Sequence, residues 1–416
     1  MIDSDLQQSI QRIEQDILTV ATFVDKTQPG WTRRPFTTWY FEAREWLMEQ
    51  MRSLNMEVSI DSASNVIGVL KGKNPSLPPI MIGSHLDTVS GGGRFDGIIG
   101  VLGGLEVVRL LKEQGIELQH TLEIVDFTAE EPSEFGISTI GSRGMVGNLT
   151  KEMLARRDPN GCTLAEAIEK AGGNPEEIDK KARKKGEVAL YLEMHIEQGP
   201  VLEETDHKLG IVTGIVGIHR YRITVEGKPN HAGTTPMNMR QDALTSSSEL
   251  ILKLEELCKK PYDEAVVGTV GKLFVLPNAA NVIPGKVIFE FEVRSIETTL
   301  IEQIISELIS FSNIVSNERN VNIAFDCLSK SEPIRVEPFI QKVIEESCQE
   351  VGPSIKLPSG AGHDANQLAT IAPIGMIFVP SRDGRSHCPE EWTDFQDIAL
   401  GVQALLRSVI EFDLSL

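Results

Sequence analysis

Histidine and acidic residues close to apolar segments are the most informative feature of this chain. The set comprises His85, Asp87, Asp96, Glu130, Glu131, His195 and His387. Imidazole and carboxylate groups together suit zinc and other borderline divalent ions. Five members of the set could serve as metal ligands, which leaves one carboxylate to hold a ligand and another to move protons. The residue types therefore predict a metal-dependent hydrolytic centre.

Three of these residues, His85, Glu130 and His195, each closely follow an apolar run that reads as a strand. The runs are residues 79–83, 122–127 and 189–194. A helical pattern over residues 97–112 separates the first two runs. Strands that alternate with helices indicate a largely parallel sheet, whose catalytic groups lie at the carboxyl ends of its strands. Residues far apart in the sequence are therefore expected to meet at one edge of the sheet.

The local patterns suggest roles for individual acidic residues. Asp87 lies two residues after His85, so it could accept the second imidazole N–H if the strand continues through both. Asp96 follows a glycine-rich loop, and its two oxygens could bridge two cations. Glu130 and Glu131 are adjacent and point in different directions, so one could bind metal while the other faces substrate.

Each pattern has a simpler interpretation when it is taken alone. The segment around Asp96 could be a surface turn, and Glu130-Glu131 could belong to an acidic loop that continues to Glu134. His195 and His387 could be ordinary buried or loop histidines. The joint occurrence of a mixed histidine and carboxylate set favours the metal centre.

Composition excludes several classes of protein. The chain has 416 residues, 41% of them hydrophobic and 24% charged, a net charge of −20 and a pI near 4.9. A surface with this much negative charge repels phosphate backbones. We therefore expect no nucleic-acid partner. The glycine loop lacks the GxGxxG spacing, and no GxxxxGK[ST] motif occurs. Five widely spaced cysteines and the absence of a long apolar run predict a cytoplasmic protein without a membrane partner.

The order of predicted elements changes near residue 214. From there to residue 327 the pattern is β-α-β-β-α-β, which predicts an inserted α+β domain of ferredoxin-like type. An α/β pattern resumes afterwards, so residues 1–213 and 328–416 are predicted to form one discontinuous metal-binding domain. Within the insertion, alternation over residues 288–294 places Arg294 on a polar face. Arg294 could clamp a substrate carboxylate there, or pair with Glu290 or Glu292 on the same face.

Seven segments, in order over nearly the whole chain, resemble one enzyme family. They are residues 85–88 (His-Leu-Asp-Thr), 93–97, 130–131 (Glu-Glu), 195–200 (His-Ile-Glu-Gln-Gly-Pro), 230–236, 281–285 (Asn-Val-Ile-Pro-Gly) and 360–365 (Gly-Ala-Gly-His-Asp-Ala). The family is that of the hydantoinase/carbamoylase-type amidases, within the aminoacylase and di-zinc peptidase superfamily. It includes N-carbamoyl-L-amino acid amidohydrolases and allantoate amidohydrolases. The resemblance implies a zinc-peptidase-like α/β domain and an inserted lid and dimerisation domain.

The resemblance also implies residue roles. His85 and His195 would hold one metal ion, Glu131 and His387 the other, and Asp96 would bridge them. Asp87 would orient His85, and Glu130 would be the general base. Substrate would meet Gln198, His219, Asn281 and Arg294. His231 would stabilise the oxyanion from across a homodimer interface, and His363 and Asp364 would line the same cleft.

The implied reaction is hydrolysis of a ureido group on a small substrate that carries a carboxylate. Two divalent ions per subunit are expected, with Zn²⁺ favoured over Mn²⁺, Co²⁺ or Ni²⁺. Residues 132–135 (Pro-Ser-Glu-Phe) depart from the glycine and basic residue common in allantoate enzymes, which favours an N-carbamoyl-L-amino acid. The alternatives are allantoate, an N-acyl amino acid or dipeptide, and a non-catalytic binding protein of the same fold. An intact Glu130 argues against the last, because binding alone needs no general base.

Overall fold

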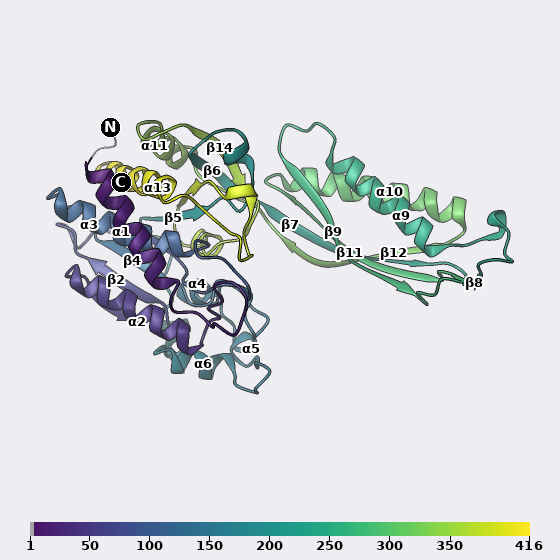
Figure 1. Ribbon diagram of the computed structural model, residues 1–416, viewed down its shortest axis with the longest axis horizontal. Coiled ribbons are helices and arrows are strands. Elements are labelled where there is room, and N and C mark those ends of the chain that lie inside the picture. The colour runs from purple at the N-terminus through teal and green to yellow at the C-terminus, as the bar shows by residue number, and fades with distance from the viewer. Residues whose placement is uncertain (1–3) are drawn as a thin grey trace. The chain divides into compact units, whose positions relative to one another are not determined.

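The computed structural model describes residues 4–416, and the chain divides into two compact units (Figure 1). The discontinuous unit comprises Met1–Thr213 and Val336–Leu416, and the inserted unit comprises Gly214–Arg335. The insertion ends at Arg335 rather than at the predicted residue 327. Strand β12 (Asn322–Ser331) stays paired with its neighbour as far as Ser331, and β13 (Ile334–Arg335) then pairs with β6 (Leu209–Ile215).

A mixed sheet forms the centre of the discontinuous unit. Its strand order is β1-β2-β4-β3-β5-β15-β6-β13, with β14 paired to β6. The remaining strands are β1 (Glu57–Ile60), β2 (Val66–Leu70), β3 (Ile80–Ser84), β4 (Leu122–Asp126), β5 (Leu190–Ile196), β14 (Ser354–Ser359) and β15 (Ile374–Val379). The central strands β4, β3, β5 and β15 are parallel, and antiparallel pairs flank them. The prediction of a mostly parallel central sheet is confirmed, and β4, β3 and β5 end at one edge.

Helices cover this sheet. The longer ones are α1 (Ser4–Val20), α2 (Thr38–Ser53), α3 (Ile98–Glu113), α11 (Pro338–Gln349) and α13 (Phe395–Ser415). The short ones are α4 (Ile140–Met145), α5 (Lys151–Leu154), α6 (Leu164–Lys170), α7 (Ile178–Lys181), α8 (Val201–Glu204) and α12 (Ala365–Leu368). Helix α3 is apolar on nearly all sides because it lies between the sheet and helices α1 and α13. Its buried Glu106 accepts a hydrogen bond of 2.8 Å from Ser9 Oγ of α1.

The inserted unit is a four-stranded antiparallel sheet with two helices on one face (Figure 1). Its elements are β7 (Gly217–Glu226), α9 (Ala243–Cys258), β9 (Val266–Leu276), β11 (Lys286–Ser295), α10 (Thr298–Arg319) and β12, with a small ribbon of β8 (Asn230–His231) and β10 (Val282–Ile283). Strand order β12-β7-β11-β9 and the β-α-β-β-α-β sequence agree with the ferredoxin-like arrangement. Alternate residues of β7 and β11 face the helices and form the core of this unit. Throughout the described part of the chain, no helix combines the length and apolar character needed to cross a bilayer.

Candidate metal centre

Asp96 lies at the centre of the predicted ligands. Its Oδ1 is 3.1 Å from His195 Nε2, and its Oδ2 is 2.9 Å from His387 Nε2. His387 Nε2 is also 3.1 Å from Glu131 Oε1. His85, Asp96 and His195 form one group that could hold a cation, and Asp96, Glu131 and His387 form a second. The structure thus brings all five predicted ligands together, with one carboxylate common to both groups.

The strands explain how these side chains meet. His85 follows the end of β3, Glu131 follows β4 after a turn at Ala129 with φ 52°, and His195 lies near the end of β5. Because these three neighbouring strands are parallel, their carboxyl ends lie side by side. His387 comes from the loop before α13, and it also has a positive φ of 57°.

Hydrogen bonds on the imidazoles test whether this group suits a cation. His195 Nδ1 donates to the carbonyl of Ile196 at 2.9 Å, and His85 Nδ1 donates to the carbonyl of Asp87 at 2.9 Å. In each neutral ring the lone pair is then on Nε2. His195 Nε2 accepts from the Gly97 amide at 3.2 Å and also lies 3.1 Å from Asp96 Oδ1, a buried oxygen that accepts no hydrogen bond while the ring is neutral. Two facing acceptors repel unless a proton or a cation lies between them, so the donor set fits a divalent ion.

The pKa values of the candidate ligands also indicate that this group suits a cation. Burial opposes protonation of His195, but its hydrogen bond and ion pair with Asp96 raise its pKa to about 9. Hydrogen bonds to Asp96 and Glu131 raise the pKa of His387 to about 11. Burial disfavours the Asp96 anion, yet the two histidines hold the pKa of Asp96 well below its usual value. Both histidines therefore bind a proton more tightly than a free imidazole does, at the atoms that would face a cation.

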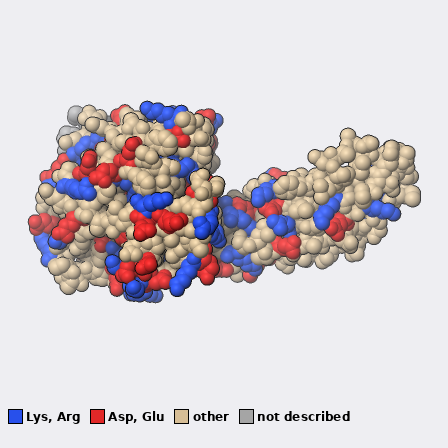
Figure 2. All heavy atoms as spheres, turned by 90° about the horizontal axis from the view of Figure 1, so that it is seen from below, with Lys and Arg blue, Asp and Glu red and all other residues tan. Residues whose placement is uncertain are grey.

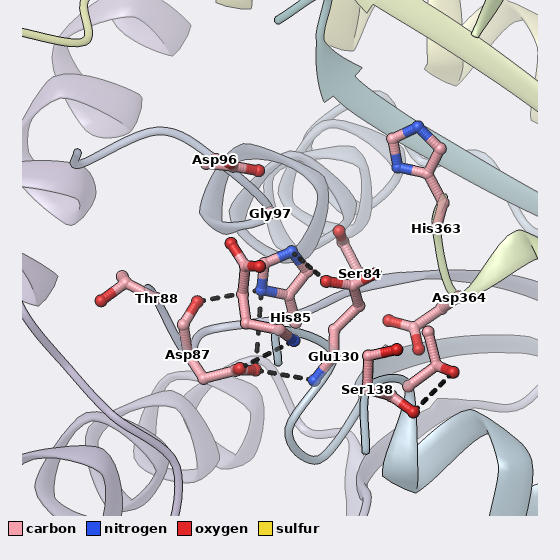
Figure 3. A network of polar contacts seen from close by, with 12 residues as sticks. Ser84, His85, Asp87, Thr88, Asp96, Gly97, Glu130, Ser138, His363 and Asp364 are labelled. Atoms are coloured by element: carbon pink, nitrogen blue, oxygen red, sulfur yellow. Dashed lines mark hydrogen bonds and ion pairs between the residues drawn. The ribbon is translucent and has the colours of Figure 1, made fainter. Parts of the chain in front are cut away.

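The Asp87 carboxylate binds the backbone of the two adjacent glutamates. It accepts a hydrogen bond of 3.1 Å from the amide of Glu130 (Figure 3). It accepts another of 3.1 Å from the amide of Glu131. The predicted bond from the His85 imidazole to this carboxylate is wrong in detail. The imidazole bonds to the Asp87 carbonyl, and the nearest carboxylate oxygen is 3.6 Å away. The alternation rule fails because β3 ends at Ser84.

Glu130 is buried and faces the first ligand group. Its Oε2 lies 3.6 Å from His85 Nε2. Burial, and then the negative charge of Glu131, raises the pKa of Glu130 well above its ordinary value. A carboxylate with a raised pKa and a position beside the ligands has the chemistry of a general base.

Gln198 also lies at the metal group. Its Nε2 donates to Asp96 Oδ2 at 2.9 Å and is 3.3 Å from His387 Nε2. His363 is buried with its ring centroid 4.6 Å from that of His195, and its Nε2 is 2.8 Å from Ser359 Oγ. Asp364 is buried beside it and accepts a hydrogen bond of 2.5 Å from Ser142 Oγ.

Four predicted residues lie in the inserted unit, two on its four-stranded sheet and two at the β8–β10 ribbon. His219 is buried on β7, and Arg294 lies on the adjacent strand β11, where its Nε donates to Glu292 at 2.7 Å. The same-face pair considered as an alternative is thus present. His231 and Asn281 are exposed at the β8–β10 ribbon, where the Ala232 amide donates to the Asn281 carbonyl at 2.9 Å.

Two buried carboxylates of the site were not predicted. Glu193, which is 1% exposed, accepts hydrogen bonds of 2.9 Å from Ser84 Oγ and Tyr191 Oη. Glu391 is also 1% exposed, and it accepts hydrogen bonds from the backbone amides of Asp96 and His387, two members of the second ligand group. A charged residue inside the apolar run 189–194 was a usable signal for Glu193. The sequence around Glu391 gave none, because acidic residues after a proline are typical of exposed loops.

The fold is an α/β domain with an inserted α+β unit, and the α/β domain carries a group of candidate metal ligands. The sequence pattern of peptidase family M20/M25/M40 matches residues 81–411. N-carbamoyl-L-amino acid amidohydrolase of Geobacillus stearothermophilus is 40% identical over 96% of this chain and 97% of its own length. Allantoate amidohydrolase of Bacillus subtilis is 36% identical over 90% and 91%. A hydantoinase/carbamoylase family amidase from Burkholderia multivorans has a TM-score of 0.91 and 32% identity, and 97% of each chain is covered.

The chain therefore belongs to peptidase family M20/M25/M40 and, within it, to the hydantoinase/carbamoylase-type amidases. It is a hydrolase of carbon–nitrogen bonds other than peptide bonds.

Proposed function

We propose that the protein hydrolyses N-carbamoyl-L-amino acids to the L-amino acid, ammonia and carbon dioxide. The observation that carries the proposal is Asp96, shared between two ligand groups with Glu130 beside them. The relative at 40% identity, an N-carbamoyl-L-amino acid amidohydrolase, supports the substrate class. Residues 132–135, which differ from the usual allantoate pattern, favour the same class.

His85 and His195 would hold one divalent ion, and Glu131 and His387 the other, with Asp96 between them. Zinc suits this mixed set best, and manganese, cobalt and nickel are the alternatives. When bound, two such ions would polarise the ureido carbonyl and lower the pKa of water, so that hydroxide is available as the nucleophile near neutral pH.

Glu130 carries the proton in this scheme. Its carboxylate takes a proton from the attacking water and delivers it to the nitrogen that leaves when the C–N bond breaks. The amino acid departs, and the remaining carbamic acid breaks down to carbon dioxide and ammonia. Asp87 holds Glu130 in place through the two backbone amides, and Gln198 orients substrate beside Asp96.

The remaining substrate residues favour a homodimer. His219 lies near the start of β7, and His231 follows the end of that strand. The part of β7 from His219 to its end advances by about seven residues, which corresponds to roughly 23 Å. That length exceeds an N-carbamoyl amino acid with a small side chain. One substrate could meet Arg294 from one subunit and His231 and Asn281 from the other, where His231 would stabilise the oxyanion. His219 pairs with Val293 of β11 and is buried, so its side chain lies on the opposite face of the sheet from Arg294. Closure of the inserted unit would bring the Arg294 guanidinium onto the substrate carboxylate.

Exposed apolar side chains on the inserted unit also favour association. Strand β9 is an edge strand, and its Leu273, Phe274 and Leu276 are 46%, 58% and 50% exposed. The face seen in Figure 2 has few charged side chains towards the end of this unit. Edge strands with apolar side chains pair readily with a second copy. Free thiols at all described cysteines fit the cytoplasm as the location of the dimer.

Product analysis separates this proposal from its alternatives. Metal-loaded protein should release ammonia from N-carbamoyl-L-amino acids faster than from allantoate, with the D-enantiomers as the control. Faster turnover of allantoate would move the assignment to that substrate. Release of free amine from N-acyl amino acids or dipeptides without ammonia would establish a deacylase or dipeptidase. Silence on all of these substrates with both ions bound would refute the proposed function and favour the non-catalytic binding protein.

A further inference from the structure

Glu391 connects the two loops that carry Asp96 and His387. Its Oε1 accepts hydrogen bonds from the amides of Phe95 at 2.9 Å and Asp96 at 3.1 Å. Its Oε2 accepts from the amide of His387 at 3.3 Å and lies 3.2 Å from Ser386 Oγ. A single buried carboxylate thus binds the backbones of two ligands that are almost three hundred residues apart in the sequence.

The residues around Glu391 leave space for its carboxylate. A Cβ at position 93 would lie 2.1 Å from Glu391 Oε1, so only glycine leaves room for the carboxylate there. The neighbouring Arg94 guanidinium lies 4.3 Å from the ring centre of Trp31 and 4.9 Å from that of Trp392. Glu391 is 1% exposed, so water competes little for the hydrogen bonds of its carboxylate.

The two ligand groups depend on this contact to different degrees. His85 and His195 are 2% exposed and are held by the ends of β3 and β5. The His387 side chain is 47% exposed on a loop with a positive φ, and no strand supports it. Asp96 has further support from Ser386 Oγ and Gln198 Nε2, each 2.9 Å from its Oδ2. His387 is therefore the ligand with the weakest independent support.

We propose that Glu391 is a positioning residue that holds His387 at the correct separation from Asp96, and so controls binding of the second divalent ion. This inference rests on the metal centre of the proposed function. The hydrogen bonds of Glu391 go to backbone amides and to Ser386 Oγ, so its effect passes through the two backbone segments and the Ser386 hydroxyl. Residues that orient metal ligands in this way typically contribute 10- to 100-fold to metal affinity.

Titration of the metal-free protein with Zn²⁺ or Co²⁺ tests the inference without an activity assay. In Glu391→Ala, we expect the ion at Glu131 and His387 to bind about 10- to 100-fold more weakly, with affinity for the first ion unchanged. Glu390→Ala is the matched control, because Glu390 is adjacent, carries the same charge and is exposed. It should bind both ions as the wild type does.

Glu391→Gln serves if the alanine variant fails to fold. The glutamine oxygen can still accept from the Phe95 and Asp96 amides, but its NH₂ group cannot accept from the His387 amide. It should therefore show the same selective loss, with near-ultraviolet circular dichroism like that of the wild type. With both ions bound at high metal concentration, kcat should recover.

The outcomes are distinct. Two ions bound with wild-type affinity in a folded Glu391 variant would overturn the inference and leave the proposed function intact. Equal weakening of both ions, or the same weakening in Glu390→Ala, would also overturn it. A wild-type protein that binds no ion at all would refute the metal centre and the proposed function together.

Discussion

The imidazole of His85 lies directly against the backbone of Gly97. A Cβ at position 97 would lie 2.3 Å from His85 Nε2, and Gly97 has a φ of +70°. The glycine that immediately precedes helix α3 thus gives the imidazole the space it needs beside Asp96. The finding explains why a glycine must follow Asp96 directly.

Gly97→Ala should disrupt the metal centre. The new methyl group would displace the His85 ring, and affinity for the first ion should fall about 10- to 100-fold. Gly115→Ala is the matched control, because Gly115 also has a positive φ, of +66°, with no atom within 4 Å of the added Cβ. Each variant should lose roughly 1 kcal/mol of stability from the strained backbone. Metal titration should separate them, and equal affinities in the two variants would contradict the steric argument.

Glu130→Ala should abolish turnover and spare metal binding. Glu130 belongs to neither ligand group, and loss of a general base typically lowers kcat by 10²- to 10⁴-fold. Its neighbour provides the contrast, because Glu131→Ala removes a ligand and should weaken binding of the second ion. Elemental analysis and kcat measured on the same samples check both variants. Wild-type activity in Glu130→Ala would refute its assignment as the base.

Metal-free protein should lose stability as the pH rises from about 5 to 9. The pKa of Glu391 is raised to about 7 by burial and then by the Asp96 charge, and that of His387 is raised to about 11. Such groups bind protons more tightly in the folded state. Their stabilising contribution is complete below the unfolded values, about 4.3 for glutamate and 6.5 for histidine, and is lost as the pH rises through the folded values.

Bound divalent ions should reverse this trend, because they take the place of the protons. The difference in Tm between metal-loaded and metal-stripped protein should therefore widen steadily between pH 5 and pH 9. Calorimetry in buffers of different ionisation enthalpy should also detect protons released on metal binding near pH 7. A Tm of stripped protein that increases over this range would contradict the prediction.

The sequence sufficed to predict that the candidate ligands meet in space because their chemistry and their position agree. His85, Glu131 and His195 have metal-binding side chains, and each closely follows or ends a strand that apolar residues make easy to recognise. Strand spacing predicts that the Asp87 carboxylate accepts from His85, but the strand ends at Ser84. The backbone turns there, with Leu86 N bonded to Asp126 at 2.9 Å, and the Asp87 carbonyl accepts from the imidazole instead.

Features created only by tertiary contact could not be predicted. Glu391 is buried by its contacts with residues 93–96, and nothing in its local sequence distinguishes it from the exposed Glu390. The apolar pattern stops at residue 327 and therefore predicts that the inserted unit ends there. Strand β12 continues with exposed residues, and its pairing with β7, rather than its hydropathy, extends it to Ser331.

Mixed dimers should reveal whether His231 acts on the metal centre of its partner. His231→Ala and Glu130→Ala homodimers should both be nearly inactive. In a hybrid of the two, the subunit with intact Glu130 receives an intact His231 from its partner, so one of the two sites is complete. Random pairing makes half of the dimers hybrids, so co-expression should restore about a quarter of wild-type activity. If His231 acted within its own subunit, no site in the hybrid would be complete and activity would stay at the level of the homodimers.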